Sequence, residues 1–322
     1  MTVRFGFLST AKINDLLLAG ARLTDAVDVV AVASRDRAHA EEYAHARGIE
    51  RAYGSYDELL AAGDLDAVYI SLPNSLHVAW SIRALDAGKH VLCEKPFDRR
   101  ASEVERAFDA AERAGRVLME AFMYRHHPQT KRLKELLDDG VVGKLRSVRS
   151  SFSFTLDDEA NVRLRPELDG GALMDVGCYC VNVSRLLAGE PVRVLGHQRV
   201  GATGVDVRFV GVLEFGEAVA HFECGFDLPS LSALEAIGSE GSLFVASPWL
   251  CRDPAVEIRR CGVVERVPVA DVDRYQAQFD HIAAAIRGEA EPLLARADSV
   301  AQARTIDALY ASAAASTTLE LS

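Results

Sequence analysis

The first 121 residues alternate short apolar runs with longer stretches that have the composition of helices. The apolar runs are residues 4–8, 27–34, 66–72, 90–94 and 116–121. Continuous apolar runs separated by helices are typical of parallel strands that are covered on both faces of their sheet. The pattern therefore predicts a doubly wound α/β domain in this part of the chain.

The pattern changes after about residue 145, where alternating runs follow one another with short turns between them. Such alternation predicts a large, mostly antiparallel sheet. Two helical stretches, near 274–288 and 297–314, close the chain. We therefore expect a domain of residues 1–121 followed by an α+β domain of residues 122–322.

Charge and composition exclude several classes of partner. The formal net charge is −11, from 36 basic and 47 acidic residues, and no basic patch offsets the repulsion of a nucleic acid backbone. The sequence has no run of 18 apolar residues and no secretory signal, so we expect a cytoplasmic protein without membrane contact. The six cysteines lack paired zinc spacing, so we expect reduced, mostly buried thiols and no metal.

The turn after the first apolar run is where a doubly wound domain would bind its ligand. Its sequence, GFLSTAKIN (6–14), has Ser9, Ala11 and Asn14 where a dinucleotide-binding loop has glycines. Small side chains still let the backbone approach a pyrophosphate, and the N-terminus of the following helix supplies N–H donors. An ordinary strand–helix turn is the alternative that this stretch alone leaves open.

The end of the second apolar run carries Ser34 and Arg35. An NAD-binding domain commonly has an acidic side chain there for the ribose 2′-hydroxyl, whereas a 2′-phosphate requires donors. Ser34 offers a hydroxyl and Arg35 a guanidinium. The nearby Asp36 is well placed to cap a helix that begins at Arg37. The sequence therefore favours NADP over NAD.

Three motifs carry a resemblance to a known family. SLPNSLH (71–77) follows one predicted strand, CEKPF (93–97) follows the next, and GGALMDVGCY (170–179) lies in the second domain. In this order they resemble the glucose-fructose oxidoreductase and inositol dehydrogenase (Gfo/Idh/MocA) family. The resemblance implies an N-terminal Rossmann domain that binds NADP, a C-terminal domain with a large open antiparallel sheet, and nicotinamide-dependent chemistry on sugars or related polyols.

Within the family, the stretches FGFLSTAKI, MEAFMYRHHPQ and MDVGCYC are most similar to NADP-dependent D-xylose dehydrogenases and dihydrodiol dehydrogenases. That branch also departs from the glycine-rich fingerprint. The resemblance implies a cofactor site that contains Ser9, Thr10, Ala11, Lys12, Ile13, Ser34, Arg35, Leu72, Pro73, Asn74, His77, Glu94 and Lys95. Two alternatives stay open, because His77 can be a polar residue that starts a helix and Lys95 a surface lysine in a salt bridge.

The polar stretch 123–131 stands between a predicted strand and a helix and can supply groups for sugar hydroxyls. Tyr124 and His127 are its candidate substrate contacts. Pro128 equally suits the first turn of a helix, with His127 at its N-terminal flank. Arg163 matches a family arginine near the active site, and an exposed loop arginine is the alternative reading.

Asp175 and Tyr179 stand four residues apart in a stretch with helical apolar spacing, so one turn would place them on the same face. The resemblance implies that Tyr179 transfers the substrate proton, with Asp175 beside it and Lys95 favouring the ionised phenol. A tyrosine that merely packs in a helix is the alternative. Cys178 and Cys180 are expected to be small buried apolar residues, because they lack further metal ligands.

We therefore predict an NADP-dependent oxidoreductase that moves a hydride between nicotinamide and the anomeric carbon of an aldose such as D-xylose. A keto-sugar reductase and a trans-dihydrodiol dehydrogenase are alternatives with the same chemistry. A non-enzymatic NADP-sensing regulator is the alternative of another class, and the presence of both Lys95 and Tyr179 favours an enzyme over it. One face of the C-terminal sheet needs a cover, which predicts a homodimer or a dimer of dimers.

Overall fold

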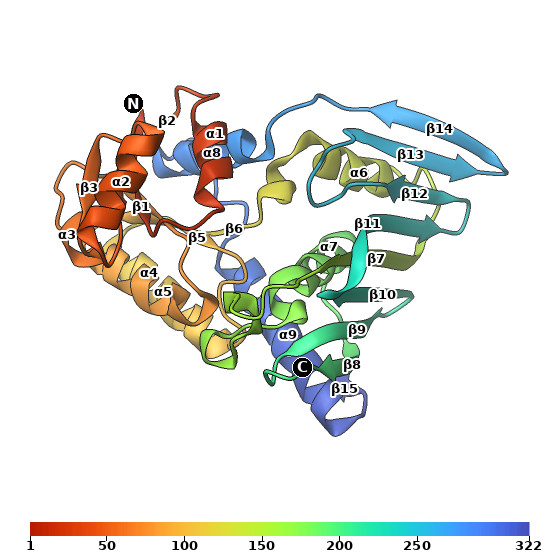
Figure 1. Cartoon of the computed structure of the whole chain (residues 1–322). Coiled ribbons are helices and arrows are strands. Elements are labelled where there is room, and N and C mark those ends of the chain that lie inside the picture. Colours follow the sequence, from red (N-terminus) through yellow and green to blue (C-terminus); the bar gives the residue numbers. More distant parts are fainter. Residues whose placement is uncertain (322) are drawn as a thin grey trace. The chain divides into compact units, whose positions relative to one another are not determined.

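Six parallel strands form the first sheet of the structure, a computed structural model that describes residues 1–321 (Figure 1). They are β1 (Val3–Leu8), β2 (Val27–Ala33), β3 (Arg51–Tyr53), β4 (Ala67–Ile70), β5 (His90–Glu94) and β6 (Leu118–Ala121). Their order is β3-β2-β1-β4-β5-β6, and every neighbouring pair is parallel. The order reverses between β1 and β4, which is the point where such sheets bind ligands. The predicted doubly wound fold is confirmed.

Helices connect these strands. They are α1 (Asn14–Ala21), α2 (Arg37–Arg47), α3 (Tyr56–Leu60), α4 (His77–Asp86) and α5 (Ala101–Ala114), with the 3₁₀ turns η1 (Asn74–Leu76) and η2 (Met123–His126). The predicted cap of α2 is confirmed, since the Asp36 carboxylate accepts a hydrogen bond of 3.0 Å from the backbone N–H of His39.

The first compact unit also includes a distant part of the chain, residues 272–300. Helix α8 (Arg274–Ile286) in that segment packs on α1, as Figure 1 shows. Phe279 is fully buried there, with its ring centroid 5.3 Å from that of Phe5 in β1. The chain therefore does not divide once after residue 121, as predicted. The first unit contains residues 1–98, 102–126 and 272–300, and the second contains residues 99–101, 127–271 and 301–322.

The second unit is built on a sheet of nine strands. They are β7 (Leu145–Thr155), β8 (Arg193–Val200), β9 (Asp206–Phe215), β10 (Ala218–Gly225), β11 (Asp227–Gly238), β12 (Ser242–Val245), β13 (Ala255–Arg260), β14 (Val263–Pro268) and β15 (Leu319–Glu320). Their order is β14-β13-β12-β11-β7-β10-β9-β8-β15. Only β7 and β10 pair in parallel among the described strands of this sheet, so the predicted mostly antiparallel sheet is confirmed.

Helices lie along one side of this sheet in Figure 1. They are α6 (Pro128–Asp138), α7 (Cys178–Ala188) and α9 (Arg296–Ala315), with the 3₁₀ turns η3 (Val162–Leu164) and η4 (Pro166–Leu168) and the π-helical turn η5 (Leu173–Gly177). Burial alternates along β10, as expected of a sheet with one covered and one open face.

No disulfide joins any of the six cysteines, and five of their side chains are buried. None of the helices formed by residues 1–321 combines the length and apolar character that crossing a membrane requires.

Candidate active site

The turn between β1 and α1 has a glycine-like conformation at a residue that is not glycine. Ser9 has a φ angle of 125°, which L side chains rarely adopt. Its hydroxyl helps to hold this conformation, because Oγ accepts a hydrogen bond of 3.2 Å from the N–H of Ala11. The same Oγ donates over 3.1 Å to the backbone oxygen of Ser71, which follows β4.

Asn14 completes this network. Its side chain is fully buried, and its amide nitrogen donates a hydrogen bond of 2.8 Å to the backbone oxygen of Ser9. Its amide oxygen accepts one of 2.7 Å from the hydroxyl of Ser71. Side chains therefore order the turn that glycines order in other dinucleotide-binding loops, and the turn leads directly into the N-terminus of α1.

Ser34 and Arg35 follow β2 and differ in exposure. Ser34 is buried, and its Oγ accepts a hydrogen bond of 3.3 Å from the N–H of Asp36. Arg35 is exposed, and its guanidinium makes no hydrogen bond or ion pair within residues 1–321. Arg37, by contrast, forms an ion pair with Glu58. Arg35 is thus available to an incoming phosphate, whereas Arg37 is already paired.

His39 is a neighbour of the turn after β1 that sequence reasoning missed. It lies in the first turn of α2, and its Nε2 is 3.0 Å from Oγ1 of Thr10. Its position three residues after the capping Asp36 is a signal that was available, because side chains in a first helical turn lie beside the positive end of the helix dipole. Lys12, in the turn between β1 and α1, is exposed.

His77 lies inside the loops that follow β4 and β5. Its ring is fully buried, with Nδ1 2.9 Å from the backbone oxygen of Pro96 and Nε2 2.8 Å from that of Leu72. Burial lowers the pKa of this imidazole, and the two carbonyl oxygens oppose the effect without overcoming it. Because a neutral imidazole carries one N–H, His77 donates a hydrogen bond to one of these carbonyl oxygens, and its ring lies between the two predicted cofactor loops.

Glu94 and Lys95 stand at the carboxyl end of β5, and both are half-buried. The Lys95–Pro96 peptide bond is cis. The hydroxyl of Tyr69 donates a hydrogen bond of 2.6 Å to the carboxylate of Glu94. Burial raises the pKa of Tyr69 well above its ordinary value, so this phenol keeps its proton and remains a donor.

In the second unit, Arg163 and Asp175 form an ion pair, with Nε 2.6 Å from Oδ2. The arginine side chain is 41% exposed and the aspartate side chain 14%. The pair ties η3 to the helical segment that carries Tyr179. Sequence reasoning named both residues and did not foresee that they bind each other.

Asp175 lies in the π-helical turn η5, which continues directly into α7 at Cys178. A π turn closes its hydrogen bonds over five residues rather than four. The spacing of Asp175 and Tyr179 is therefore not the regular α-helical turn that the sequence predicts. Single π turns inside helices are frequent at functional sites.

An aromatic cluster holds Tyr179. The residue is 5% exposed, and its ring centroid lies 5.4 Å from that of Phe152 and 5.7 Å from that of Trp249. The indole N–H of Trp249 donates a hydrogen bond of 3.0 Å to the backbone oxygen of Ser151 in β7. Cys178 and Cys180, on either side of Tyr179 in the sequence, are buried, as predicted. Burial raises the pKa of the Cys180 thiol to about 12.

The residues that the structure describes contain no group of three or more His, Cys, Asp or Glu side chains arranged to hold a metal.

Tyr124 and His127, the predicted substrate contacts, are both buried. Tyr124 lies in η2 of the first unit, with its ring centroid 6.2 Å from that of Phe122. His127 is the N-cap of α6, where Nδ1 accepts a hydrogen bond of 3.0 Å from the N–H of Gln129 and Pro128 takes the first helical position. This is the helix-start arrangement left open by the sequence, and contact with a substrate remains a prediction.

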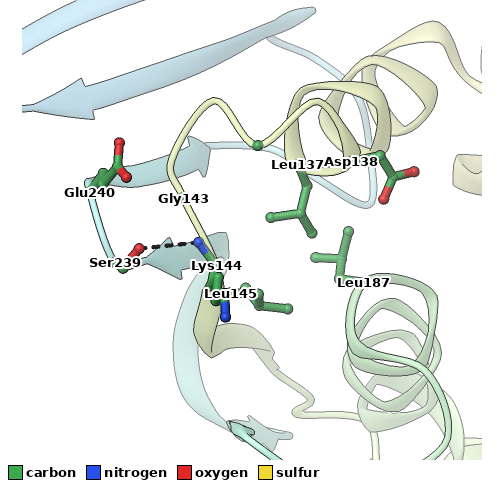
Figure 2. Close-up of a pocket in the computed structure, with 9 residues that line it drawn as sticks. Leu137, Asp138, Gly143, Lys144, Leu145, Leu187, Ser239 and Glu240 are labelled. Atoms are coloured by element: carbon green, nitrogen blue, oxygen red, sulfur yellow. Dashed lines mark hydrogen bonds between the residues drawn. The ribbon is translucent and has the colours of Figure 1, made fainter.

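A surface hollow of about 610 Å³ lies in the second unit and contains none of the predicted site residues (Figure 2). Leu137 of α6 and Leu187 of α7 point toward each other across it. Its other lining residues include Lys144, Ser239 and Glu240. The hollow therefore plays no part in the site assigned here.

The predicted cofactor residues of the first unit share one property of position. Residues 9–13, 34–35, 72–77 and 94–95 lie at or just after the carboxyl end of a strand, namely β1, β2, β4 and β5. Because these four strands are parallel, their carboxyl ends lie on one edge of the sheet. In the second unit the structure brings together Arg163 and Asp175, with Tyr179 following in the same helical segment.

The fold and the polar turns at this sheet edge define the class of dinucleotide-dependent oxidoreductases. Two family models match the chain: one described as an oxidoreductase family with an NAD-binding Rossmann fold (residues 4–122) and one as the GFO/IDH/MocA C-terminal domain (residues 130–244). The chain belongs to the GFO/IDH/MocA oxidoreductase family. The resemblance read from the sequence and the prediction of an enzyme are confirmed.

Relatives include sugar and diol dehydrogenases. D-xylose 1-dehydrogenase (NADP(+)) 2 of Haloferax volcanii is 43% identical over 98% of this chain and 99% of its own. Trans-1,2-dihydrobenzene-1,2-diol dehydrogenase of Danio rerio is 34% identical over 84% of this chain and 81% of its own.

Solved structures include a 3-ketoreductase from Actinomadura kijaniata, in complex with NADP and TDP-benzene. It has a TM-score of 0.90 and 32% identity, and the match covers 97% of this chain and 98% of that chain. The aldose-aldose oxidoreductase of Caulobacter crescentus has a TM-score of 0.93 and 26% identity, with full coverage of both chains. The prediction of an NADP-dependent oxidoreductase agrees with the D-xylose dehydrogenase, whose name includes NADP(+), and with the 3-ketoreductase, whose structure contains NADP.

The Ser9 turn yields a pair of substitutions with opposite outcomes. Ser9→Gly should bind NADP within about threefold of the native protein, because glycine adopts a φ of 125° without strain. Ser9→Val should weaken binding by roughly 1–3 kcal/mol, since a branched side chain is strained there and forms no hydrogen bonds. Fluorescence titration with NADP measures both, and equal affinities of the two variants would contradict the assignment.

Proposed function

We propose that this chain is an NADP-dependent dehydrogenase that transfers a hydride between nicotinamide and the anomeric carbon of an aldose of the D-xylose type. The observation that carries the proposal is its near full-length similarity to a D-xylose 1-dehydrogenase, at 43% identity. We assign cofactor binding to the strand ends within residues 1–121 and substrate selection to residues 122–322.

The strand ends of the first unit suit a dinucleotide that carries a 2′-phosphate. The Ser9 turn and the N-terminus of α1 offer backbone donors for the pyrophosphate, and Ser34 with Arg35 offers donors for the phosphate on the adenosine ribose. Leu72, Pro73 and Asn74 line the approach to the nicotinamide ribose, His77 holds their loop, and Glu94 and Lys95 stand beside the nicotinamide. When bound, NADP supplies the acceptor or donor of the hydride.

Tyr179 and Lys95 carry the proton chemistry in this proposal. Tyr179 takes the proton of the substrate hydroxyl during oxidation and returns it during reduction. An ionised phenol is favoured by a nearby positive charge, which is the role assigned to Lys95. Asp175, fixed by its ion pair with Arg163, orients the substrate, and Tyr124 and His127 complete the substrate contacts.

A keto-sugar reductase is the second candidate. It is supported by the 3-ketoreductase that shares the fold over 97% of this chain. A dihydrodiol dehydrogenase has similar support from the Danio rerio relative. The regulator alternative has no comparable support, because the relatives named above are enzymes.

A substrate panel separates these candidates. Purified protein is assayed with NADP and pentoses, hexoses and trans-dihydrodiols, and with NADPH and keto-sugars. We expect the highest kcat/KM for D-xylose or a close pentose, since the relative with the greatest identity quoted above acts on that sugar. Turnover confined to keto-sugars would assign the reductase instead, and no turnover on any substrate would favour the regulator.

Arg35→Ala should weaken NADP far more than NAD. The exposed guanidinium has no partner within residues 1–321, so it is available for a charge-assisted contact with the 2′-phosphate. Its loss should cost about 1–3 kcal/mol of NADP binding. Arg37→Ala is the matched control, because Arg37 is paired with Glu58. The same loss for both cofactors would show that Arg35 does not read the phosphate.

Tyr179→Phe and Lys95→Ala should each lower kcat by about 10²-fold or more, the scale of general acid–base catalysis. NADP affinity should be largely retained, which a fluorescence titration checks independently of turnover. Near-native turnover of Tyr179→Phe across the pH range would mean that Tyr179 only packs against Phe152 and Trp249.

We also propose that the chain forms a two-fold dimer, or a dimer of such dimers, through the open face of the nine-stranded sheet. Leu195, Val210 and Val219, on the neighbouring strands β8, β9 and β10, are 40–41% exposed. The strand register places these side chains on one face. Exposed apolar side chains on an uncovered sheet face are typical of a surface that another copy covers. Charged and polar side chains lie between them on this face, since Val219 is paired with Glu214 and Val210 with His197 and Glu223.

Light scattering at micromolar concentration should give the mass of a dimer or tetramer. Val219→Glu should shift the protein toward the monomer, because a carboxylate would be buried without a partner. Leu23→Glu, at an exposed position in the first unit, is the control and should leave the mass unchanged. A native monomer would refute the dimer.

We also propose that the protein resides in the cytoplasm. It is supported by six cysteines of which none forms a disulfide.

A further inference from the structure

Asp206 is a buried carboxylate that no proposed step has used. It is the first residue of β9 and is 3% exposed. Its Oδ2 accepts a hydrogen bond of 2.7 Å from the backbone N–H of Leu173, and its Oδ1 accepts one of 2.8 Å from the hydroxyl of Tyr310. Leu173 is the first residue of η5, so the carboxylate binds the start of the segment that carries Asp175 and Tyr179.

The two glycines before this segment are explained by the same contact. Gly171 has a φ of 127°, and a Cβ atom there would lie 2.1 Å from Oδ1 of Asp206. A Cβ atom on Gly170 would lie 2.4 Å from the backbone oxygen of Arg163. The GGALM sequence therefore lets the backbone approach Asp206 on one side and the Arg163 loop on the other.

The charge of Asp206 suits its place. A carboxylate at the N-terminus of a helical segment meets the positive end of the dipole and a free N–H donor. Burial raises the pKa of Asp206 to about 6, and its hydrogen bonds oppose that rise, so the group is mainly ionised at pH 7. Burial also raises the pKa of Tyr310 well above its ordinary value, so the phenol stays a donor.

Tyr310 is itself held in place by its surroundings in the second unit. Its ring centroid lies 5.7 Å from that of Phe209 in β9, and the guanidinium of Arg99 lies 5.0 Å above the ring. The carboxylate is therefore fixed from β9 and α9 at once. A fixed carboxylate that binds the first N–H of η5 sets where this helical segment begins.

We propose that Asp206, held by Tyr310, is a positioning residue for proton transfer by Tyr179, through its hydrogen bond to the start of η5. This inference rests on the role proposed for Tyr179. A buried carboxylate destabilises the fold unless it accepts hydrogen bonds. Asp206 accepts one from Leu173 at the start of η5 and one from the Tyr310 hydroxyl. Asp206 acts through Tyr179 and touches no reacting atom.

The test compares Asp206→Asn with the native protein and with Glu217→Gln, an exposed carboxamide control in the turn between β9 and β10. Asparagine keeps the size of the side chain and removes the charge. We expect Asp206→Asn to lower kcat by about tenfold or more, with the NADP dissociation constant unchanged. Tyr310→Phe should give a smaller loss in the same direction, because it removes the brace and leaves the carboxylate.

A double substitution separates positioning from other roles. If Asp206 acts through Tyr179, adding Asp206→Asn to Tyr179→Phe should lower kcat little further, whereas independent effects would multiply. Multiplying effects, or native kcat in Asp206→Asn, would overturn the inference. A lower melting temperature with native kcat would likewise mean that Asp206 is only structural.

Amide hydrogen exchange gives a readout that needs no substrate. Asp206→Asn should speed exchange in residues 173–179 of the holoenzyme and leave the first unit unchanged. If Tyr179→Phe retains native turnover, the role proposed for Tyr179 fails, and exchange still decides whether Asp206 anchors the segment. Native exchange rates in Asp206→Asn would overturn the anchor itself.

Discussion

The hydrogen bond of 3.1 Å from the Ser9 hydroxyl to the backbone oxygen of Ser71 joins the ends of β1 and β4 where the strand order of the first sheet reverses. A doubly wound sheet leaves its ligand site at this point, and the chain must form the site from whatever follows the two strands. Glycines usually serve because their backbone is unrestricted. Here a buried asparagine and two serines restrict the backbone instead, so polar side chains replace conformational freedom.

Sequence reasoning succeeded where a physical pattern is local. Continuous apolar runs predicted five of the parallel strands, and the capping role of Asp36 could be read from its place before a helix. It missed β3 because Arg51–Tyr53 is short and half-buried, without the apolar run that marks the other strands. The placement of residues 272–300 in the first unit was also beyond it, since α8 depends on contacts with α1 far away in the sequence.

The candidate site divides in the same way. Motif resemblance named Arg163, Asp175 and Tyr179, and the structure adds the Arg163–Asp175 ion pair and the π turn. The motif itself carries no signal for the π turn, and the contacts of this turn come from distant parts of the sequence, since Asp206 binds Leu173 and Arg163 binds Asp175. Asp206 itself looked like an ordinary residue at the start of a strand, and only its burial and its two hydrogen bonds set it apart.

The return of the chain to the first unit through residues 272–300 has a consequence for biosynthesis. A ribosome releases the polypeptide from its N-terminus, and a domain made of one continuous segment can fold while the rest is still being made. Here β1 and α1 pack against Phe279 and α8, which leave the ribosome only after most of the second unit has been synthesised. Until then the surface of α1 that α8 covers stays exposed to solvent, so the first unit cannot complete its packing before most of the second unit has been synthesised.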